Sequence, residues 1–344
     1  MFAAATPFAL PARARTTLDP AVADDVYAGL TRKGQKTLPA SLLYDAVGSA
    51  LFEVITLLPE YGLTRADAQL LSRKSGEIVR AAGSPQRIVE LGSGTGSKTR
   101  HILEASAKSA AAAKKAAAAK RNAIRYSPID ISAAALEQCS RALGSLPRVA
   151  IEPIEANYLD GLKKSVSGRS AGDRILLLFL GSTIGNFSRA EAVTFLRKLR
   201  AILRPGDTLL LGTDLVKPAA KLISAYADSI GATAAFNLNL LARINRELGG
   251  NFVLPRFAHE ARWNQRSSRV EMHLRSLQAQ QVRIEAFELD VSFAAGETIW
   301  TESSHKFRAQ DIPAIAERAG WSARRQWLDS DWGFAETLLE IPAE

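Results

Sequence analysis

Three glycines at alternating positions mark the stretch of this chain that points most directly to chemistry. Residues 87–99 read Arg-Ile-Val-Glu-Leu-Gly-Ser-Gly-Thr-Gly-Ser-Lys-Thr, a short apolar run that leads into Gly92, Gly94 and Gly96. Glycine tolerates positive φ and lets a ligand approach the backbone where other residues carry a Cβ. The N–H groups that open a following helix then face that ligand. The stretch predicts a strand, a tight turn and a helix start, either around a ligand or as a plain connection.

The spacing of the glycines narrows the choice of ligand. A dinucleotide site has the pattern G-x-G-x-x-G, whereas this turn has G-x-G-x-G with Glu90 just before it. A P-loop is excluded, because Lys98 stands too close to Gly96 and the sequence contains no G-x-x-x-x-G-K-S/T. The pattern Glu-x-Gly-x-Gly-x-Gly at the end of a first strand resembles motif I of the class I S-adenosylmethionine-dependent methyltransferases.

Polar residues also follow the most apolar strand of the chain. Ile175–Leu180 is apolar at every position, which is expected of a central strand covered on both faces. The run Gly-Ser-Thr-Ile-Gly-Asn-Phe comes next and carries Ser182, Thr183 and Asn186. In open α/β sheets, ligands bind beyond the carboxyl ends of the strands. We therefore expect these three side chains at a binding site.

From residue 87 onward strands and helices alternate, which is typical of a parallel sheet with crossover helices. The predicted fold class is α/β, with a seven-stranded, Rossmann-like sheet of the class I methyltransferase type whose last strand is antiparallel. A helix and a closing hairpin at the end of the chain favour this sheet over that of a dehydrogenase. The predicted strands are 87–91, 124–130, 150–154, 174–181, 207–213, 322–329 and 334–341, and the closing helix is 309–320.

The pattern changes after Asp214, and we interpret the change as a second, α+β domain that binds substrate. Its predicted elements are helices at 219–231 and 236–248 and an antiparallel meander with strands near 252–263, 269–278 and 282–293. Helices at 24–58 and 65–81 are predicted before the glycine turn. The predicted divisions are a flexible arm at 1–20, a substrate-binding domain at 21–65 plus 215–305, and an S-adenosylmethionine-binding domain at 66–214 plus 306–344.

Composition narrows the class of protein. With 47% hydrophobic and 23% charged residues the chain has an ordinary globular composition. The single cysteine, Cys139, rules out an intramolecular disulfide, so we expect a cytoplasmic protein. The histidines are scattered and form no H-x-x-x-H pair, so no metal site is predicted. No apolar run reaches the roughly 18 residues of a transmembrane helix.

The net charge is +9, and several basic residues crowd into an alanine-rich stretch at 104–121, which we interpret as a helix extension or a solvated surface insertion. A basic surface can bind RNA, but no aromatic residues interleave with these lysines. Residues 1–20 carry positive charge after their apolar part, the reverse of a signal peptide. We therefore expect no nucleic acid and no membrane among the partners. We expect a monomer, because a helical domain that covers the site requires no partner chain.

Several ordered segments carry a closer resemblance. They run from about residue 24 to the carboxyl end, and each is individually uncommon. The segments are Tyr44-Asp-Ala-Val-Gly-Ser-Ala-Leu-Phe52, Leu58-Pro-Glu-Tyr-Gly-Leu-Thr-Arg65, Glu90-Leu-Gly-Ser-Gly-Thr, Leu180-Gly-Ser-Thr-Ile-Gly-Asn-Phe187, Ala234-Ala-Phe-Asn237 and Glu302-Ser-Ser-His-Lys-Phe307. On these segments the chain resembles the histidine-specific methyltransferase family. The resemblance implies S-adenosylmethionine as cofactor and the amino acid L-histidine as substrate.

The resemblance also implies which residues bind the cofactor. Asp130, at the end of the second strand, would accept hydrogen bonds from the ribose hydroxyls, since a carboxylate can accept from two hydroxyl groups at once. Its structural alternative, which does not exclude this role, is to cap the helix at 133. Asn157 and Tyr158 stand where the family usually has Asp-Phe beside the adenine. The full implied set is Glu90, Gly92, Gly94, Lys98, Asp130, Asn157 and Tyr158.

A second implied set surrounds the substrate. Asn186 and Tyr226 would hold its α-carboxylate and α-amino group. Tyr44 and Tyr61 would line the amino side. Glu302 and Ser304 would hydrogen-bond the two imidazole nitrogens, and Met272 would pack against the ring. Each also has a structural alternative, as a half-buried aromatic, a core filler or a solvated charge at a strand end.

The implied reaction is attack of the neutral α-amine on the sulfonium methyl, up to three times, to give hercynine, the first intermediate of ergothioneine. Such a methyl is already activated, so the protein mainly supplies alignment and desolvation. Tyr61 and Asn186 would act at the amine, and Tyr61 or a water could accept its proton. Two alternatives stay open: another aromatic amino acid such as tryptophan as substrate, and an RNA-binding methyltransferase that uses the basic residues at 108–125.

Overall fold

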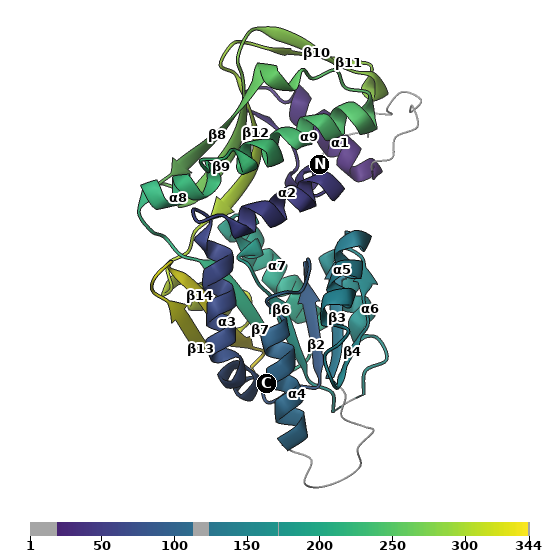
Figure 1. The fold of residues 1–344 in the computed structure, drawn as a ribbon, viewed down its shortest axis with the longest axis vertical. Coiled ribbons are helices and arrows are strands. Elements are labelled where there is room, and N and C mark those ends of the chain that lie inside the picture. The colour runs from purple at the N-terminus through teal and green to yellow at the C-terminus, as the bar shows by residue number, and fades with distance from the viewer. Residues whose placement is uncertain (1–18, 113–123, 171, 343–344) are drawn as a thin grey trace, which may run out of the picture. The chain divides into compact units, whose positions relative to one another are not determined.

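The computed structural model of the protein describes residues 19–112, 124–170 and 172–342, and the chain divides into two compact units (Figure 1). Unit 1 contains the described residues up to Glu60, with Leu222–Asn264 and Val270–Ser303. Unit 2 contains Tyr61–Lys221, Gln265–Arg269 and the described residues from Ser304 onward. The divisions predicted at residues 65, 215 and 305 lie a few residues away, and Gln265–Arg269 was expected in the other domain.

Unit 2 is built on a sheet with the strand order β13-β14-β7-β6-β2-β3-β4, in which β5 also pairs with β3. Neighbours from β4 to β7 are parallel, whereas β14 is antiparallel to both β7 and β13. The strands are β2 (Arg87–Leu91), β3 (Ile124–Asp130), β4 (Val149–Ile151), β5 (Ile154–Glu155), β6 (Ile175–Phe179), β7 (Thr208–Asp214), β13 (Ser322–Asp329) and β14 (Phe334–Glu340). This order and mixed direction confirm the predicted class I methyltransferase fold.

One predicted strand is interrupted. Residues 150–154 were expected to form a single strand, but they contribute to two short ones, β4 and β5. Pro153 lacks the N–H that a continuous ladder needs, and the N–H of Glu152 donates to the carbonyl of Tyr126 at 2.8 Å. Both short strands pair with β3, so the interruption leaves the strand order unchanged.

Helices cover the sheet of unit 2. They are α3 (Gly62–Ala81), α4 (Arg100–Ala112), α5 (Ala133–Leu143), α6 (Tyr158–Val166), α7 (Arg189–Ile202) and α10 (Asp311–Arg318). Helix α3 packs against α4, β13 and β14, whereas α7 packs against α6 and α10. Ser188 and Glu191 form a reciprocal capping box that starts α7.

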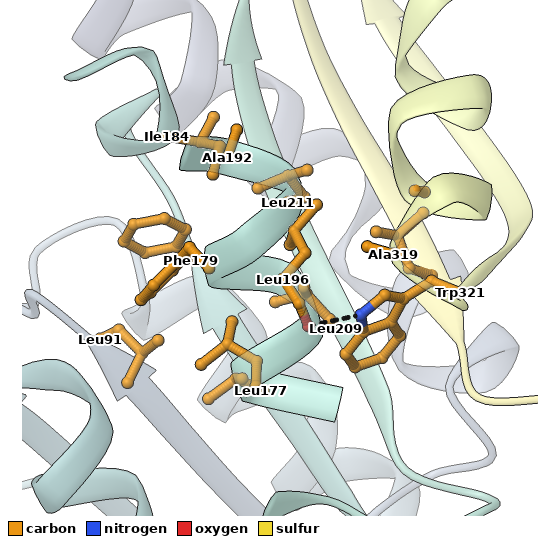
Figure 2. Close-up of a cluster of buried hydrophobic side chains, with 14 of the residues drawn as sticks. Leu91, Leu177, Phe179, Ile184, Ala192, Leu196, Leu209, Leu211, Ala319 and Trp321 are labelled. Atoms are coloured by element: carbon orange, nitrogen blue, oxygen red, sulfur yellow. Dashed lines mark hydrogen bonds between the residues drawn. The ribbon is translucent and has the colours of Figure 1, made fainter. Parts of the chain in front are cut away.

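The core of unit 2 lies between the central strands and α6, α7 and α10 (Figure 2). All side chains of β6 and β7 are buried, as expected for central strands. Leu196 and Leu209 lie near Trp321 in this core, and Trp321 Nε1 donates to the Leu196 carbonyl at 2.9 Å. The indole N–H is thereby satisfied inside the core. This packing fixes the strand ends on which the candidate site depends.

Unit 1 contains a sheet with the order β1-β12-β9-β8 and a separate antiparallel hairpin of β10 and β11. Its strands are β1 (Lys36–Thr37), β8 (Phe257–Asn264), β9 (Arg269–Ser276), β10 (Gln280–Ile284), β11 (Leu289–Phe293) and β12 (Thr298–His305). Its helices are α1 (Pro20–Thr31), α2 (Ala46–Leu57), α8 (Ala219–Tyr226) and α9 (Ala232–Leu248), and the last residues of β12 and the first of α8 and β9 belong to unit 2.

Several boundaries in unit 1 differ from those predicted. The helix expected at 24–58 is divided into α1 and α2, because Gly34 has a φ of +88° and the chain then forms β1, which is parallel to β12. The strand expected at 282–293 is the hairpin β10–β11, and Glu288 has a φ of +49° where the chain turns. Strand β12 was not predicted. The arm expected at 1–20 lies outside the described residues except for Asp19, which caps α1, and Pro20.

Within the described ranges, no single helix has both the length and the apolar character needed to cross a membrane. The helices α2 and α3 reach that length and composition only when they are counted together as a bent pair.

Candidate active site

The glycine turn that follows β2 is held against the end of β3. The N–H of Gly92 donates to the carbonyl of Ile129 at 2.8 Å. Gly92, Gly94 and Gly96 have φ values of +69°, +50° and +68°. A Cβ at Gly96 would lie 2.6 Å from Cys139 Sγ, whereas a Cβ at Gly94 would meet no atom of the described residues within 4 Å. At position 96 the close packing against Cys139 requires glycine. At position 94 the positive φ favours glycine, and the space beside it is open to a ligand.

Asp130, the last residue of β3, faces this turn. Its Oδ2 accepts a hydrogen bond from the Gly94 N–H at 3.1 Å, and its Oδ1 accepts one from the Ser132 N–H at 3.0 Å. The cap of α5 is Ser132, whose Oγ accepts from the Ala135 N–H, so the alternative of Asp130 as a cap is wrong. Each carboxylate oxygen has a second acceptor site. The side chain is thus held in place and suited to the two hydroxyls of a ribose.

The carboxylate of Glu90 is turned into the protein. It is 3% exposed and accepts hydrogen bonds from Thr99 Oγ1, at 2.8 and 2.7 Å, and from the Tyr126 hydroxyl. Burial raises the pKa of Glu90 to about 7, although both hydroxyl groups oppose the rise. The side chain joins β2, β3 and the residue before α4. In this geometry the Glu90 side chain stabilises the glycine turn from the interior of the protein.

Lys98, also predicted to border the cofactor, forms an ion pair with a residue of α3. Its Nζ lies 2.5 Å from Oδ2 of Asp67, whose side chain is fully buried. The same oxygen accepts the N–H of Gly181, just beyond β6, at 3.0 Å. Burial alone lowers the pKa of the Lys98 ammonium, but the charge of Asp67 outweighs this and the pKa is raised. The ammonium stays charged beside the turn and is suited to a carboxylate of a ligand.

Asn157 and Tyr158 open helix α6. Asn157 caps the helix, because its Oδ1 accepts the Asp160 N–H at 3.0 Å and its Nδ2 donates to the Asp160 carboxylate at 2.8 Å. The ring of Tyr158 packs edge-on against Phe179, with centroids 5.6 Å apart. Its hydroxyl would lie 3.3 Å from a Cβ at Gly92. Burial and the charge of Asp130 raise the pKa of Tyr158 to about 12. Tyr158 therefore lies beside the glycine turn.

Three of the predicted substrate residues belong to unit 2. Tyr61 precedes α3 and is 7% exposed. Asn186 ends the 3-10 helix 183–186 beyond β6, at the carboxyl edge of the sheet, and is exposed. Ser304 lies near the end of β12, is 7% exposed, and its Oγ accepts a hydrogen bond from Lys306 Nζ at 2.8 Å. The other two polar residues expected beyond β6 bond to the main chain, since Ser182 accepts the Asp214 N–H and Thr183 donates to the Leu180 carbonyl.

The other four predicted substrate residues belong to unit 1. Met272 on β9 is 2% exposed, and its carbonyl accepts the hydroxyl of Thr301, which precedes Glu302 on the neighbouring strand β12. The structure thus brings Met272 and Glu302 onto adjacent strands. The ring of Tyr44 lies 5.7 Å from that of Phe236 in α9. The four residues are Tyr44, Tyr226, Met272 and Glu302.

Two residues that the sequence analysis did not identify contact predicted site residues in unit 2. Asp67 partners Lys98, and Lys306 partners Ser304. Lys306 lies inside a segment that carried the family resemblance, and a lysine between the strand residue His305 and Phe307 was the available signal. Asp67 gave no such signal, because acidic residues are common on helices.

A model of the family described as "Histidine-specific methyltransferase, SAM-dependent" matches residues 22–341. The chain belongs to this family. The methyltransferase is 44% identical over 315 residues to the histidine N-alpha-methyltransferase of Mycolicibacterium smegmatis, and the match covers 91% of this chain and 93% of the relative. The cofactor of the family is S-adenosylmethionine, as its description states.

Two fungal relatives are more distant. The methyltransferase is 34% identical to ergothioneine biosynthesis protein 1 of Neurospora crassa, with 63% of this chain and 24% of that protein covered. It is 27% identical to the L-tryptophan methyltransferase trpM of Psilocybe serbica, with 86% of each covered.

Proposed function

We propose that this methyltransferase transfers methyl groups from S-adenosylmethionine to the α-amino nitrogen of L-histidine. The observation that carries the proposal is the identity of 44% with the histidine N-alpha-methyltransferase of M. smegmatis over nearly the whole of both chains. The presence of Glu302 and Ser304 on one strand, β12, supports it from the residues. These two side chains supply hydrogen-bonding groups for an imidazole ring.

The cofactor side of the reaction rests on residues of unit 2. S-adenosylmethionine supplies an activated methyl group when it is bound. Asp130 would orient its ribose and Lys98 would hold its carboxylate, while Gly94 leaves the space for it. The protein contributes alignment and exclusion of water, which can supply much of the acceleration of a two-substrate reaction.

The substrate side needs a neutral amine, because an ammonium has no lone pair. Asn186 and Tyr226 would hold the α-carboxylate and α-amino group, and Tyr44 and Tyr61 would line the amino side. Tyr61 or a water would accept the amine proton. Glu302 would accept the N–H of the imidazole, and Met272 on the adjacent strand would pack against the ring.

We further propose up to three successive transfers, with hercynine as the final product and ergothioneine biosynthesis as its pathway. The similarity to the N. crassa ergothioneine protein supports the pathway. We propose a cytoplasmic monomer without nucleic-acid partners. Most of the basic stretch that favoured the RNA-binding alternative lies outside the described residues.

A second candidate substrate is tryptophan, which the similarity to the P. serbica enzyme favours. Mass spectrometry of L-histidine incubated with the purified protein and S-adenosylmethionine, beside tryptophan, tyrosine and an RNA control, distinguishes the candidates. We expect histidine with three added methyl groups and no change in the others. Methylated tryptophan with unmodified histidine would replace the proposal by its alternative.

A further inference from the structure

A chain of buried polar contacts in unit 2 ends on Ser304. Lys306 is fully buried, and its Nζ lies 2.8 Å from Ser304 Oγ and 2.8 Å from Asp214 Oδ2. The other carboxylate oxygen of Asp214 accepts hydrogen bonds from Trp332 Nε1, at 3.0 Å, and from Lys217 Nζ. A buried ammonium is costly unless it is paired and hydrogen-bonded, and here the pairing is provided by Asp214.

The main chain fixes this group as firmly as the side chains do. The carbonyl of Lys306 accepts a hydrogen bond from Arg189 Nη2 at 2.7 Å. The N–H of the next residue, Phe307, donates to the carbonyl of Asp214 at 2.9 Å. Residues 304–307 are thereby attached to the end of β7, the fully buried strand that Asp214 closes. The position of Lys306 is set by the sheet and does not depend on Ser304.

The chemistry of lysine decides the direction of the bond to Ser304. An ammonium group has three donors and no acceptor, whereas a hydroxyl can both donate and accept. In the contact with Lys306 the Ser304 oxygen must therefore accept. Its own proton is then directed away from Lys306 and toward a different acceptor. Without Lys306 the hydroxyl would be able to rotate between the two roles.

We propose that Lys306 and Asp214 are positioning residues that hold the Ser304 hydroxyl as a hydrogen-bond donor to the unprotonated nitrogen of the substrate imidazole. The inference rests on the proposed function, since it takes L-histidine as the substrate. Glu302, two residues earlier on β12, is an acceptor when ionised. Together the two side chains select a ring with one N–H and one bare nitrogen, the neutral form of imidazole.

The test compares L-histidine with the two pyrrolylalanines, in which one ring nitrogen is replaced by C–H and the other keeps its N–H. Dissociation constants are measured by calorimetry with S-adenosylhomocysteine present, so that no reaction occurs. A pyrrole ring leaves the Ser304 hydroxyl without its acceptor, and an unpaired buried donor is costly. Wild type should therefore bind even the tighter-binding of the two pyrrolylalanines about ten- to a hundredfold more weakly than histidine. Ser304→Ala should abolish most of this preference for histidine. Lys306→Met should show a preference between that of wild type and that of Ser304→Ala.

The matched control is Arg169→Met. Arg169 and Asp207 form another buried ion pair, with Nη1 and Oδ2 at 2.7 Å, and Asp207 directly precedes β7, which Asp214 ends. This variant also breaks a buried pair, so it can lose stability, but it should keep the wild-type preference for histidine. All variants should bind S-adenosylhomocysteine as wild type does.

An unchanged preference in Lys306→Met would overturn the inference and leave the proposed function intact. If Lys306→Met does not fold, Ser304→Ala still decides, because an unchanged preference there excludes a donor role for the hydroxyl. Failure of the wild-type protein to bind L-histidine at all, with S-adenosylhomocysteine bound normally, would overturn the proposed function and the inference with it.

Discussion

Asp67 and Lys98 form an ion pair in which Oδ2 of the buried Asp67 carboxylate lies 2.5 Å from Nζ of the partly buried Lys98 ammonium. The pair joins helix α3 to the turn after β2, and the N–H of Gly181 adds the loop after β6 through the same oxygen. Three segments that approach the proposed cofactor are thus fixed by one carboxylate. The glycine turn depends on α3 as well as on its own sequence.

Asp67→Asn should lower the free energy of unfolding by about 3 kcal/mol, because breaking a buried pair leaves an uncompensated charge. It should also weaken the binding of S-adenosylhomocysteine. Urea unfolding and calorimetry measure the two effects. The control is Asp173→Asn, which breaks a more exposed pair with Arg87 and should cost about 1 kcal/mol or less. Equal losses in the two variants would show that Asp67 has no special role.

Gly94→Ala and Gly96→Ala should have different effects although both glycines have positive φ. At Gly94 the added methyl meets open space in the described structure, so we expect a loss of about 1–2 kcal/mol from backbone strain and a large loss of cofactor affinity. At Gly96 the methyl would meet Cys139 Sγ at 2.6 Å, so the loss of stability should be greater. Thermal unfolding and titration with S-adenosylhomocysteine separate the two; unimpaired binding by folded Gly94→Ala would contradict the proposed cofactor site.

The stability of the protein should carry a pH dependence that originates at Glu90. Its pKa is raised by burial from 4.5 to about 7 in the folded state, so the folded protein holds the proton more tightly than the unfolded chain. The contribution is fully present below about pH 4.5 and is lost as the pH rises to about 7, a change of about 3 kcal/mol. Glu90→Gln cannot titrate, so its stability relative to wild type should rise over this interval. Urea unfolding at pH 4.5 and 7.5 measures the difference in stability between Glu90→Gln and wild type. An equal difference at the two pH values would contradict the assignment.

Glu336 on β14 should be neutral in the folded protein. Its side chain is fully buried, and burial together with the charge of Asp67 raises its pKa well above 4.5. Glu336→Gln keeps the shape of the protonated acid, so the free energy of unfolding at pH 7 should stay within about 1 kcal/mol of wild type. Glu336→Ala leaves a cavity and should lose about 3 kcal/mol. If Gln were as destabilising as Ala, the native residue would have to be a charged, paired carboxylate.

Glu302→Ala should weaken L-histidine binding about ten- to a hundredfold, because the imidazole N–H loses its proposed hydrogen-bond acceptor. Binding of S-adenosylhomocysteine should be unchanged. Glu297→Ala is the matched control, since Glu297 directly precedes β12 but pairs with Lys36. Calorimetry with each ligand measures both affinities. Equal loss of histidine and cofactor affinity in Glu302→Ala would remove it from the substrate site.

The sequence predicted those elements whose signal is local. Strands 87–91 and 124–130 were predicted to the residue, because apolar runs bounded by glycine or polar residues define buried parallel strands. The prediction failed at 24–58, where helix-favouring residues continue past a turn at Gly34, and at β12, which alternates too weakly to be recognised. Partners far along the chain decide the structure of both segments, since β1 pairs with β12, and β12 lies between β1 and β9 in the sheet.

The same contrast between local signals and distant partners applies to the candidate site. Gly94 and Asp130 could be identified from one motif and one strand end, and the structure joins them by a hydrogen bond. The bond between Lys306 and Asp214 could not be identified, because it depends on the register between the end of β7 and residues 304–307. The family resemblance identified Ser304, and only the fold identified the residue that orients it.

An ion-paired aspartate stands at each end of β7, since Asp207, which directly precedes the strand, pairs with Arg169, and Asp214, its last residue, pairs with Lys306. Between them every residue is buried and three consecutive residues are leucine, so hydrophobic burial alone would tolerate a shift of the strand by one or two residues past its neighbours. Such a slip would separate both carboxylates from their partners and leave charges in the interior. The two ends together therefore act against misfolded alignments of the central sheet, and they leave one alignment of β7 that pairs both aspartates.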